Sequence, residues 1–259
     1  MGCVETRFAS VYSKYPIVRS NHVDYETLLL SESDVGQLYN IYLKLSPPER
    51  VEVTASDICD HLHIDDTPFA RKVLGLGEGM DVSFATFVIG VWNFCTIDKN
   101  CFELFVHDLY DTSRKGVLSI ADIDVMIKEV YGNDYHSNIQ AKRACLKLQE
   151  VQLVEMDVYS FRQFSKAHNA VFYPIFSMQS RVRCCVLGDA FWCSKALCRI
   201  HMSKREYVPI HVILSRRTSS TSSAGIFTDN CSSSIDDGID RKPLAFLLRP
   251  SSVAPDSAM

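Results

Sequence analysis

Oxygen-bearing residues recur at short intervals between Asp111 and Asp122. Counted from Asp111 as position 1, the candidate donors at positions 1, 3, 9 and 12 are the side chains of Asp111, Ser113, Ser119 and Asp122, and the donor at position 7 is the backbone carbonyl of Val117. Position 6 is Gly116, which permits a sharp turn. Calcium takes about six to eight oxygen ligands, and a twelve-residue loop between two helices supplies them at this spacing. The sequence therefore indicates a candidate metal loop at 111–122.

Two features weaken the ligand set of this loop. Position 5 is Lys115, whose ammonium has no acceptor atom, and Asp122 is one methylene shorter than the glutamate usual at position 12. Asp111 and Asp122 are balanced by Arg114 and Lys115, so the loop carries no formal charge. Because affinity follows ligand charge, we expect Ca²⁺ to bind with a Kd of roughly 10⁻⁴ M or weaker, or not at all, and Mg²⁺ to compete.

Helices are expected on both sides of the loop. Apolar residues at i, i+3, i+4, i+7 and i+8 predict one helix over 102–110 and another over 123–131. Leu118, at position 8, is the apolar residue that would pair with a neighbouring loop in a short β-ribbon. Residues from about Tyr25 to Met202 have mainly helical patterns, so the expected fold class is all-α.

Residues 102–132, and more loosely 38–170, resemble the calcineurin B and neuronal calcium sensor branch of the EF-hand superfamily. The matching residues are Leu109-Tyr110-Asp111, Gly116-Val117-Leu118-Ser119 and Asp122-Ile123, which correspond to the third hand of that family. The resemblance implies four EF-hands in two lobes, an N-terminal myristoyl group, and regulation of a partner enzyme or channel. We expect an N-lobe over 25–100, a C-lobe over 101–170 and an extra C-terminal helix in the segment 171–214.

The first two loops lack a calcium ligand set. Aligned by an apolar position 8 at Val53, the first loop spans 46–57 and has Pro48 at a ligand position and Val51 where the glycine belongs. The second loop, 75–86, has no carboxylate at positions 1, 3, 5 or 12. We expect both loops to serve as scaffolding whose helices still pair.

The fourth loop is degenerate as well. Placed at 152–163, it has Val154 and Met156 at ligand positions. A weak internal repeat supports the pairing of units, since residues 80–87 and 156–164 both end in Ser-Phe-x-x-Phe. The sequence thus predicts one partly intact metal loop among three degenerate ones.

The chain begins Met1-Gly2-Cys3-Val4-Glu5-Thr6, a pattern typical of N-myristoylation at Gly2. One myristoyl chain binds a membrane only marginally, so stable anchoring needs a basic patch or a second acyl chain, for which Cys3 is the palmitoylation candidate. A chance match is the alternative, because Gly and Thr are common residues. We expect residues 1–24 to be an acylated segment that holds a cytoplasmic protein at the membrane surface.

A basic block lies between Arg181 and Arg217, where eight basic residues occur with two acidic ones. It suits an anionic membrane surface, although a solvated helix face is the simpler interpretation. Apolar residues between Phe172 and Val186 follow helical spacing. They fit a packed core helix, or a helix that yields a hydrophobic groove to a protein target.

The composition changes after residue 214. Of the twenty residues 215–234, eleven are Ser or Thr, so we expect a disordered, Ser-rich tail over 215–259. Ser219 follows Arg216-Arg217-Thr218 and is a phosphorylation candidate for a basophilic kinase. A phosphate there would weaken attraction to anionic lipid.

Net charge, hydropathy and motif spacing argue against a nucleic-acid-binding protein, an integral membrane protein, a zinc protein and an enzyme. A net charge of -4 gives no general argument for nucleic-acid binding, and the most apolar stretch, Phe84–Phe94, is far shorter than the ~20 residues that span a bilayer. The cysteines between Cys184 and Cys198 and the nearby His201 match no paired zinc motif. No local signature of a Cys/His nucleophile is present either, so we expect a protein that is not an enzyme.

The function expected from these observations is that of a membrane-anchored, noncatalytic regulatory or adaptor subunit that binds a protein target through a hydrophobic groove. The alternative is a calcium sensor whose lobe opens on binding and exposes that groove to an effector. An enzyme would need a cleft with a strongly perturbed titratable group.

Overall fold

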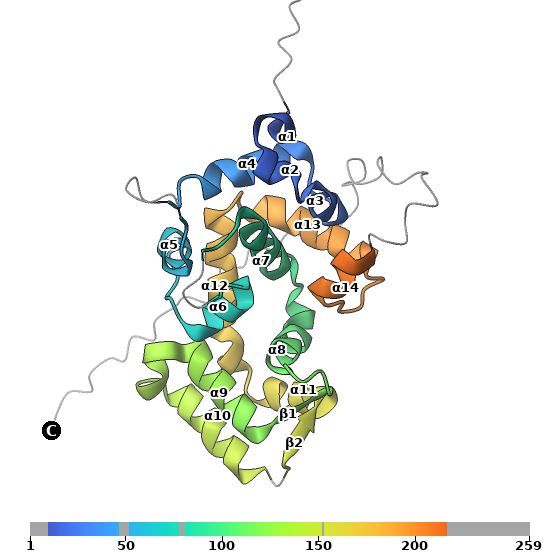
Figure 1. The fold of residues 1–259 in the computed structure, drawn as a ribbon. Helices are drawn as coiled ribbons and strands as arrows, with labels where there is room; N and C mark the ends of the chain where they lie inside the picture. Colours follow the sequence, from blue (N-terminus) through green and yellow to red (C-terminus); the bar gives the residue numbers. More distant parts are fainter. Residues whose placement is uncertain (1–9, 47–51, 78–80, 152, 217–259) are drawn as a thin grey trace, which may run out of the picture. The chain divides into compact units, whose positions relative to one another are not determined.

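The computed structural model describes residues 10–46, 52–77, 81–151 and 153–216. Within these ranges the chain is predominantly helical, with one two-stranded sheet (Figure 1), which confirms the all-α class. The α-helices of the first half are α1 (Val11–Lys14), α2 (Pro16–Arg19), α3 (His22–Thr27), α4 (Glu32–Tyr42), α5 (Ala55–His61), α6 (Pro68–Leu74) and α7 (Phe84–Thr96). Those of the second half are α8 (Phe102–Tyr110), α9 (Ile120–Tyr131), α10 (Ile139–Glu150), α11 (Val158–Ala167), α12 (Tyr173–Cys185), α13 (Asp189–Met202) and α14 (Ile210–Ser215). The two strands are β1 (Val117–Ser119) and β2 (Glu155–Asp157).

Helices α5, α7, α9 and α11 begin with a local device that they share with α4, α6 and α10. An oxygen of the N-cap side chain accepts a hydrogen bond from the backbone N–H three residues later, which satisfies a donor that has no partner inside the helix. In α5, α7, α9 and α11 the N-cap and donor pairs are Thr54 and Asp57, Ser83 and Thr86, Ser119 and Asp122, and Asp157 and Ser160. Each of these four helices leaves one of the four loops predicted from the sequence.

The four loops pair two by two. Strands β1 and β2 are antiparallel and place Leu118 opposite Met156, so the predicted ribbon at Leu118 is confirmed. In the first half, the backbone N–H of Val82 donates to the carbonyl oxygen of Val53 at 2.8 Å. The first pair is a short antiparallel ladder, and the second is held by this single backbone hydrogen bond. In both pairs, the residues in contact lie just before the N-caps of the following helices. The loop pairing therefore repeats in both halves of the chain.

The predicted register of the fourth loop is wrong by three residues. Met156 lies opposite Leu118, so Met156 occupies position 8, and the loop spans 149–160 instead of 152–163. The Ser-Phe-x-x-Phe repeat misaligns the two halves because Ser83 is an N-cap, whereas Ser160 lies three residues after the N-cap Asp157.

Helices α6 and α7 touch at Gly90, which lies within α7. A Cβ atom added at Gly90 would lie 2.0 Å from the carbonyl oxygen of Leu74, the last residue of α6. No side chain fits at that distance, so the glycine lets the two backbones meet. The contact joins the buried faces of α6 and α7, which include Phe69 and Phe87.

The described helices begin before residue 25 and continue to Ser215. Tyr25 is fully buried within α3. The buried apolar residues form one continuous cluster from Val18 to Ile213. The chain divides into two units, 1–223 and 224–259, and all described residues belong to the first. No helix within the described ranges is both long enough and apolar enough to cross a bilayer.

Candidate functional site

The carboxylate of Asp111 organises the loop 111–122 from within. Asp111 follows the last residue of α8, and its oxygens accept hydrogen bonds from the hydroxyl of Ser113 at 3.0 Å and from the N–H groups of Lys115 at 3.0 Å and Gly116 at 2.6 Å. Desolvation opposes ionisation, but the bonds from Gly116 and Lys115 outweigh it and hold the pKa of Asp111 below its ordinary value. The carboxylate thus remains charged and bonded to its own loop.

Asp122 is turned toward the start of α9. One of its oxygens accepts hydrogen bonds from the N–H of Ser119 at 3.0 Å and from the hydroxyl of Ser119 at 2.6 Å. In return, the N–H of Asp122 donates to that hydroxyl oxygen at 3.1 Å. This reciprocal arrangement is a capping box, and it stabilises the first turn of the helix. Two of the five predicted ligands therefore bind each other.

The turn in the loop is made by two residues with left-handed backbone. Arg114 has φ of 55° and Gly116 has φ of 76°. A Cβ at Gly116 would meet nothing within 4 Å, so the requirement for glycine there is conformational and not steric. The structure confirms the sharp turn predicted at position 6.

The predicted ligands come together on one loop, where most of them also bond one another or the loop backbone. Lys115 offers no oxygen at position 5, and the side chains of Asp111, Ser113, Ser119 and Asp122 are bonded to groups of the loop itself. Val117 contributes its backbone to β1. Across the described part of the chain, no group of three or more His, Cys, Asp or Glu residues could hold a metal ion.

His107 lies behind this loop and was not singled out from the sequence. Its side chain is 3% exposed, its ring meets that of Phe161 at 5.6 Å between centroids, and among the described residues its Nε2 atom has no hydrogen-bond partner. Burial lowers the pKa of His107, although nearby Asp111 and Asp108 favour the charged form. The core of this half therefore contains a histidine whose burial favours the neutral ring.

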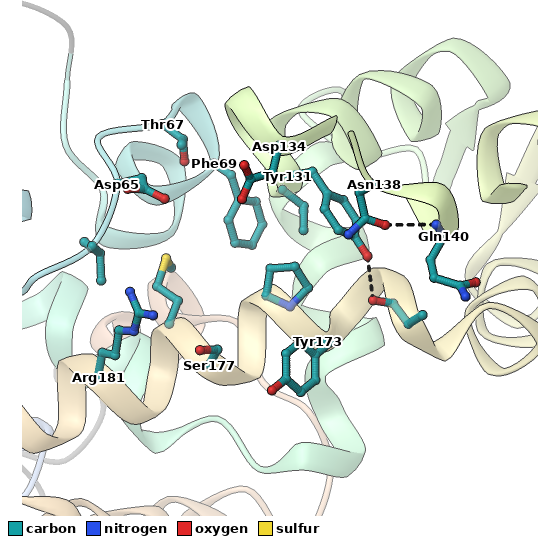
Figure 2. A pocket seen from close by; sticks show the side chains of 15 residues that line it. Asp65, Thr67, Phe69, Tyr131, Asp134, Asn138, Gln140, Tyr173, Ser177 and Arg181 are labelled. Carbon is teal, nitrogen blue, oxygen red and sulfur yellow. Dashed lines mark hydrogen bonds between the residues drawn. The ribbon is translucent and has the colours of Figure 1, made fainter. Parts of the chain in front are cut away.

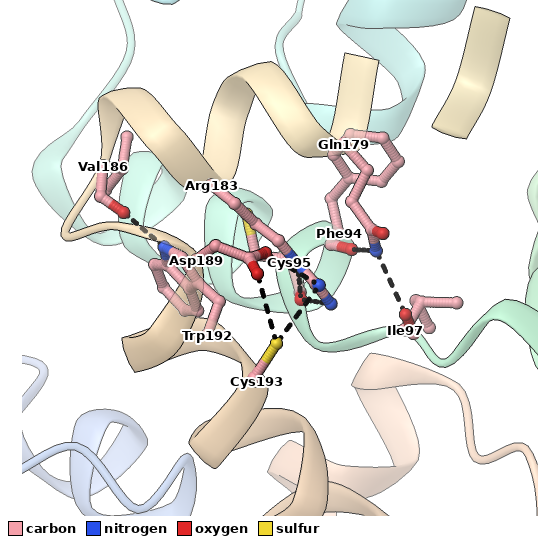
Figure 3. Close-up of polar contacts among 9 residues, drawn as sticks. All are labelled: Phe94, Cys95, Ile97, Gln179, Arg183, Val186, Asp189, Trp192 and Cys193. Atoms are coloured by element: carbon pink, nitrogen blue, oxygen red, sulfur yellow. Dashed lines mark hydrogen bonds and ion pairs between the residues drawn. The ribbon is translucent and has the colours of Figure 1, made fainter. Parts of the chain in front are cut away.

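The C-terminal helices cover the end of α7 (Figure 3). The side chain of Gln179 in α12 donates to the carbonyl oxygens of Phe94 at 2.7 Å and Ile97 at 3.0 Å. Arg183 donates through Nε and Nη2 to the carbonyl oxygen of Cys95 at 2.9 and 2.6 Å. The last carbonyls of a helix have no partner inside it and carry partial negative charge, so an amide and a cation suit them.

Arg199 of α13 completes this cover. It is 5% exposed and donates to Asn93, Thr96 and the carbonyl oxygen of Val208, all of which are neutral acceptors. Burial lowers the pKa of Arg199 to about 10. Its guanidinium also lies 5.1 Å from the ring centre of Trp92. A side chain counted from the sequence as a surface cation therefore belongs to the core.

Three members of the basic block are used inside the protein. Besides Arg183 and Arg199, Lys195 donates to Asp34 at 2.9 Å and to the carbonyl oxygen of Leu29 at 2.6 Å. Lys204 and Arg205 are exposed at the end of α13. Fewer cations than the sequence suggested are thus available to an anionic surface.

A cavity of about 400 Å³ lies between the loop before α6, the end of α9 and helix α12 (Figure 2). Its lining combines apolar side chains such as Phe69 and Met178 with the carboxylates of Asp65 and Asp134 and the guanidinium of Arg181. The cavity is the kind of mixed apolar and polar recess in which a ligand or a partner's side chain can bind.

The remaining predicted residues, Gly2, Cys3 and Ser219, lie outside the described residues, as does most of the expected tail, 217–259. The sequence analysis missed the cover over α7, because the acceptors are backbone carbonyls more than eighty residues away from Gln179 and Arg183. Comparison with family models, with curated proteins and with solved structures finds no match for this chain.

Proposed function

We propose that this protein is a noncatalytic adaptor or regulatory subunit built from two pairs of EF-hand-like units, in which calcium binds weakly or not at all. The observation that carries the calcium part of the proposal is the donor set of the loop 111–122, where Lys115 offers no acceptor at position 5 and the bonds within the loop already use part of the acceptor capacity of Asp111 and Asp122. The contacts Leu118–Met156 and Val82–Val53 support the paired architecture.

The protein partner would bind at the cavity of Figure 2. This recess lies between the two halves of the helical unit, and its apolar lining gives a partner side chain area to bury. Asp65 and Asp134 would favour a basic group on the partner. Acylation at Gly2 and Cys3 would hold the complex at the cytoplasmic face of a membrane, with exposed cations such as Lys204 and Arg205 adding attraction to anionic lipid.

Calorimetry of the full chain tests the calcium part of this proposal. We expect a Kd for Ca²⁺ weaker than about 10⁻⁴ M. At that limit, 1 mM Ca²⁺ would stabilise the folded protein by about 1.4 kcal/mol at most. Asp111→Ala should change little beyond its structural cost, and Asp81→Ala, which removes an exposed carboxylate from the second loop, is the matched control. A Kd below roughly 10⁻⁵ M that is lost in Asp111→Ala would instead establish a calcium sensor.

Affinity capture from detergent-solubilised membranes tests the adaptor part. The bait is the acylated full chain, and Gly2→Ala is the control that cannot be myristoylated. We expect the same partner to be recovered in calcium and in chelator, and a bait with Asp65→Asn and Asp134→Asn to recover less of it. Recovery only in calcium would favour the sensor, and a partner insensitive to both aspartates would rule out the cavity as its site.

A further inference from the structure

Helix α10 presents two opposite faces. Its buried side consists of Ala141, Ala144, Cys145 and Leu148. At 100° per residue, the line directly opposite contains Ile139, Arg143, Leu146 and Glu150. Ile139 is 62% exposed and Leu146 is 59% exposed, which makes them two of the most exposed large apolar residues of the described chain. Figure 1 shows α10 beside α9. The structure thus leaves an apolar stripe on α10 without a partner.

We propose that α10 is a self-association surface, which pairs antiparallel with α10 of a second copy of this chain. In such a pair, a two-fold axis passes near Leu146, so the Leu146 side chains of the two copies meet. Arg143 of each copy then faces Glu150 of the other copy. Arg143 lies three residues before the axis and Glu150 four residues after it, so the two charges differ by one residue in their distance from the axis, an offset that the long arginine side chain can span.

The apolar surface continues past the end of α10. Leu153 is 50% exposed and Val154 is 84% exposed. Ile139, Leu146 and Leu153 are spaced by seven residues, so Ile139 of one copy approaches the segment around Leu153 of the other. A parallel arrangement would instead place Arg143 against Arg143. The charges therefore select the antiparallel pairing.

The size of α10 sets the strength of this contact. A helix of 12 residues is about 18 Å long, and two such helices bury an area at the low end of specific interfaces. We therefore expect a reversible dimer that forms at micromolar concentrations and above. The inference does not depend on the proposed adaptor function, because it concerns a different face of the molecule.

Sedimentation equilibrium of the reduced, unacylated full chain tests the proposal over a concentration range of about 5–300 μM. The weight-average mass should rise from 29.3 kDa toward twice that value. Leu146→Asp should weaken association by at least about tenfold. Leu197→Asp changes a side chain of similar exposure, 58%, on α13 and should leave association unchanged. A monomer at every concentration would overturn the proposal.

Charge reversal provides the sharper test. Arg143→Glu alone and Glu150→Arg alone should each weaken self-association, because each places like charges opposite one another. An equimolar mixture of the two variants should associate as the unaltered chain does, since every pair in the mixed dimer is then Glu against Arg. Glu150 also bonds Lys147 within α10 at 2.5 Å, so Lys147→Gln is the control for loss of that bond. Association that these reversals do not change would overturn the proposal, and circular dichroism confirms that each variant is folded.

Discussion

Replacing Gly90 by alanine should destabilise the protein, although alanine is the better helix former. The added Cβ would lie 2.0 Å from the carbonyl oxygen of Leu74, well inside the contact distance of about 3.2 Å. Helices α6 and α7 would have to separate by about 1 Å, which weakens packing across their buried faces. Such overpacking costs about 3 kcal/mol or more, and helix propensity returns about 1 kcal/mol. We expect a net loss of at least about 2 kcal/mol.

The same substitution at Gly36 is the matched control. Gly36 lies within α4, and a Cβ there would meet Val11 at 3.9 Å, an ordinary contact. Gly36→Ala should therefore stabilise the protein by roughly 0.5–1 kcal/mol. Urea unfolding followed by far-UV circular dichroism measures both changes. If Gly90→Ala unfolds within about 0.5 kcal/mol of the unaltered chain, α6 and α7 do not meet as described.

Gln179, His107 and Ser119 give three further predictions, the first two from buried side chains and the third from a helix cap. Gln179→Met keeps the side-chain volume but leaves two buried carbonyls without their donor, so the free energy of unfolding should fall by about 2–4 kcal/mol. In the same urea assay, the control Gln163→Met, on the exposed side of α11, should lower it by less than about 0.5 kcal/mol. Burial lowers the pKa of His107 below its ordinary value of 6.5, so the folded state favours the neutral ring, and the free energy of unfolding should fall as the pH drops below about 6.5. His107→Phe should flatten this pH dependence. An equally steep dependence in the variant would contradict the role of His107. Ser119→Ala removes the acceptor for the N–H of Asp122 and should lower the thermal stability by about 1 kcal/mol, with no effect of calcium on that loss.

The sequence predicted best what is local. The turn at Gly116 depends on one residue's backbone freedom, and the ribbon at Leu118 depends on an apolar residue between polar ones. The fourth loop was misplaced because its alignment followed the Ser-Phe repeat instead of the buried strand residue Met156. Degenerate loops keep no ligands to fix the register, so the apolar strand residue and the N-cap Asp157 after it are the better guides.

The sequence predicted least well what depends on distant contacts. In the sequence, Gly90 is only a glycine within the apolar stretch Phe84–Phe94, and the position of Leu74 is needed to show that it permits a backbone contact. Arg183 and Arg199 looked like surface charges because a sequence does not show which cations face backbone carbonyls. The number of basic residues between Arg181 and Arg217 therefore overestimates the positive charge that this segment presents at the surface.

The cover over the end of α7 bears on how this chain is made. A ribosome adds Gln179, Arg183 and Arg199 well after α7, and their side chains donate to the backbone carbonyls of Asn93, Phe94, Cys95 and Ile97. Until then those groups must stay in water or be shielded by a chaperone. The first half of the nascent protein therefore lacks these donors until the last helices emerge, and a chain that ended after α11 would leave the same carbonyls without them.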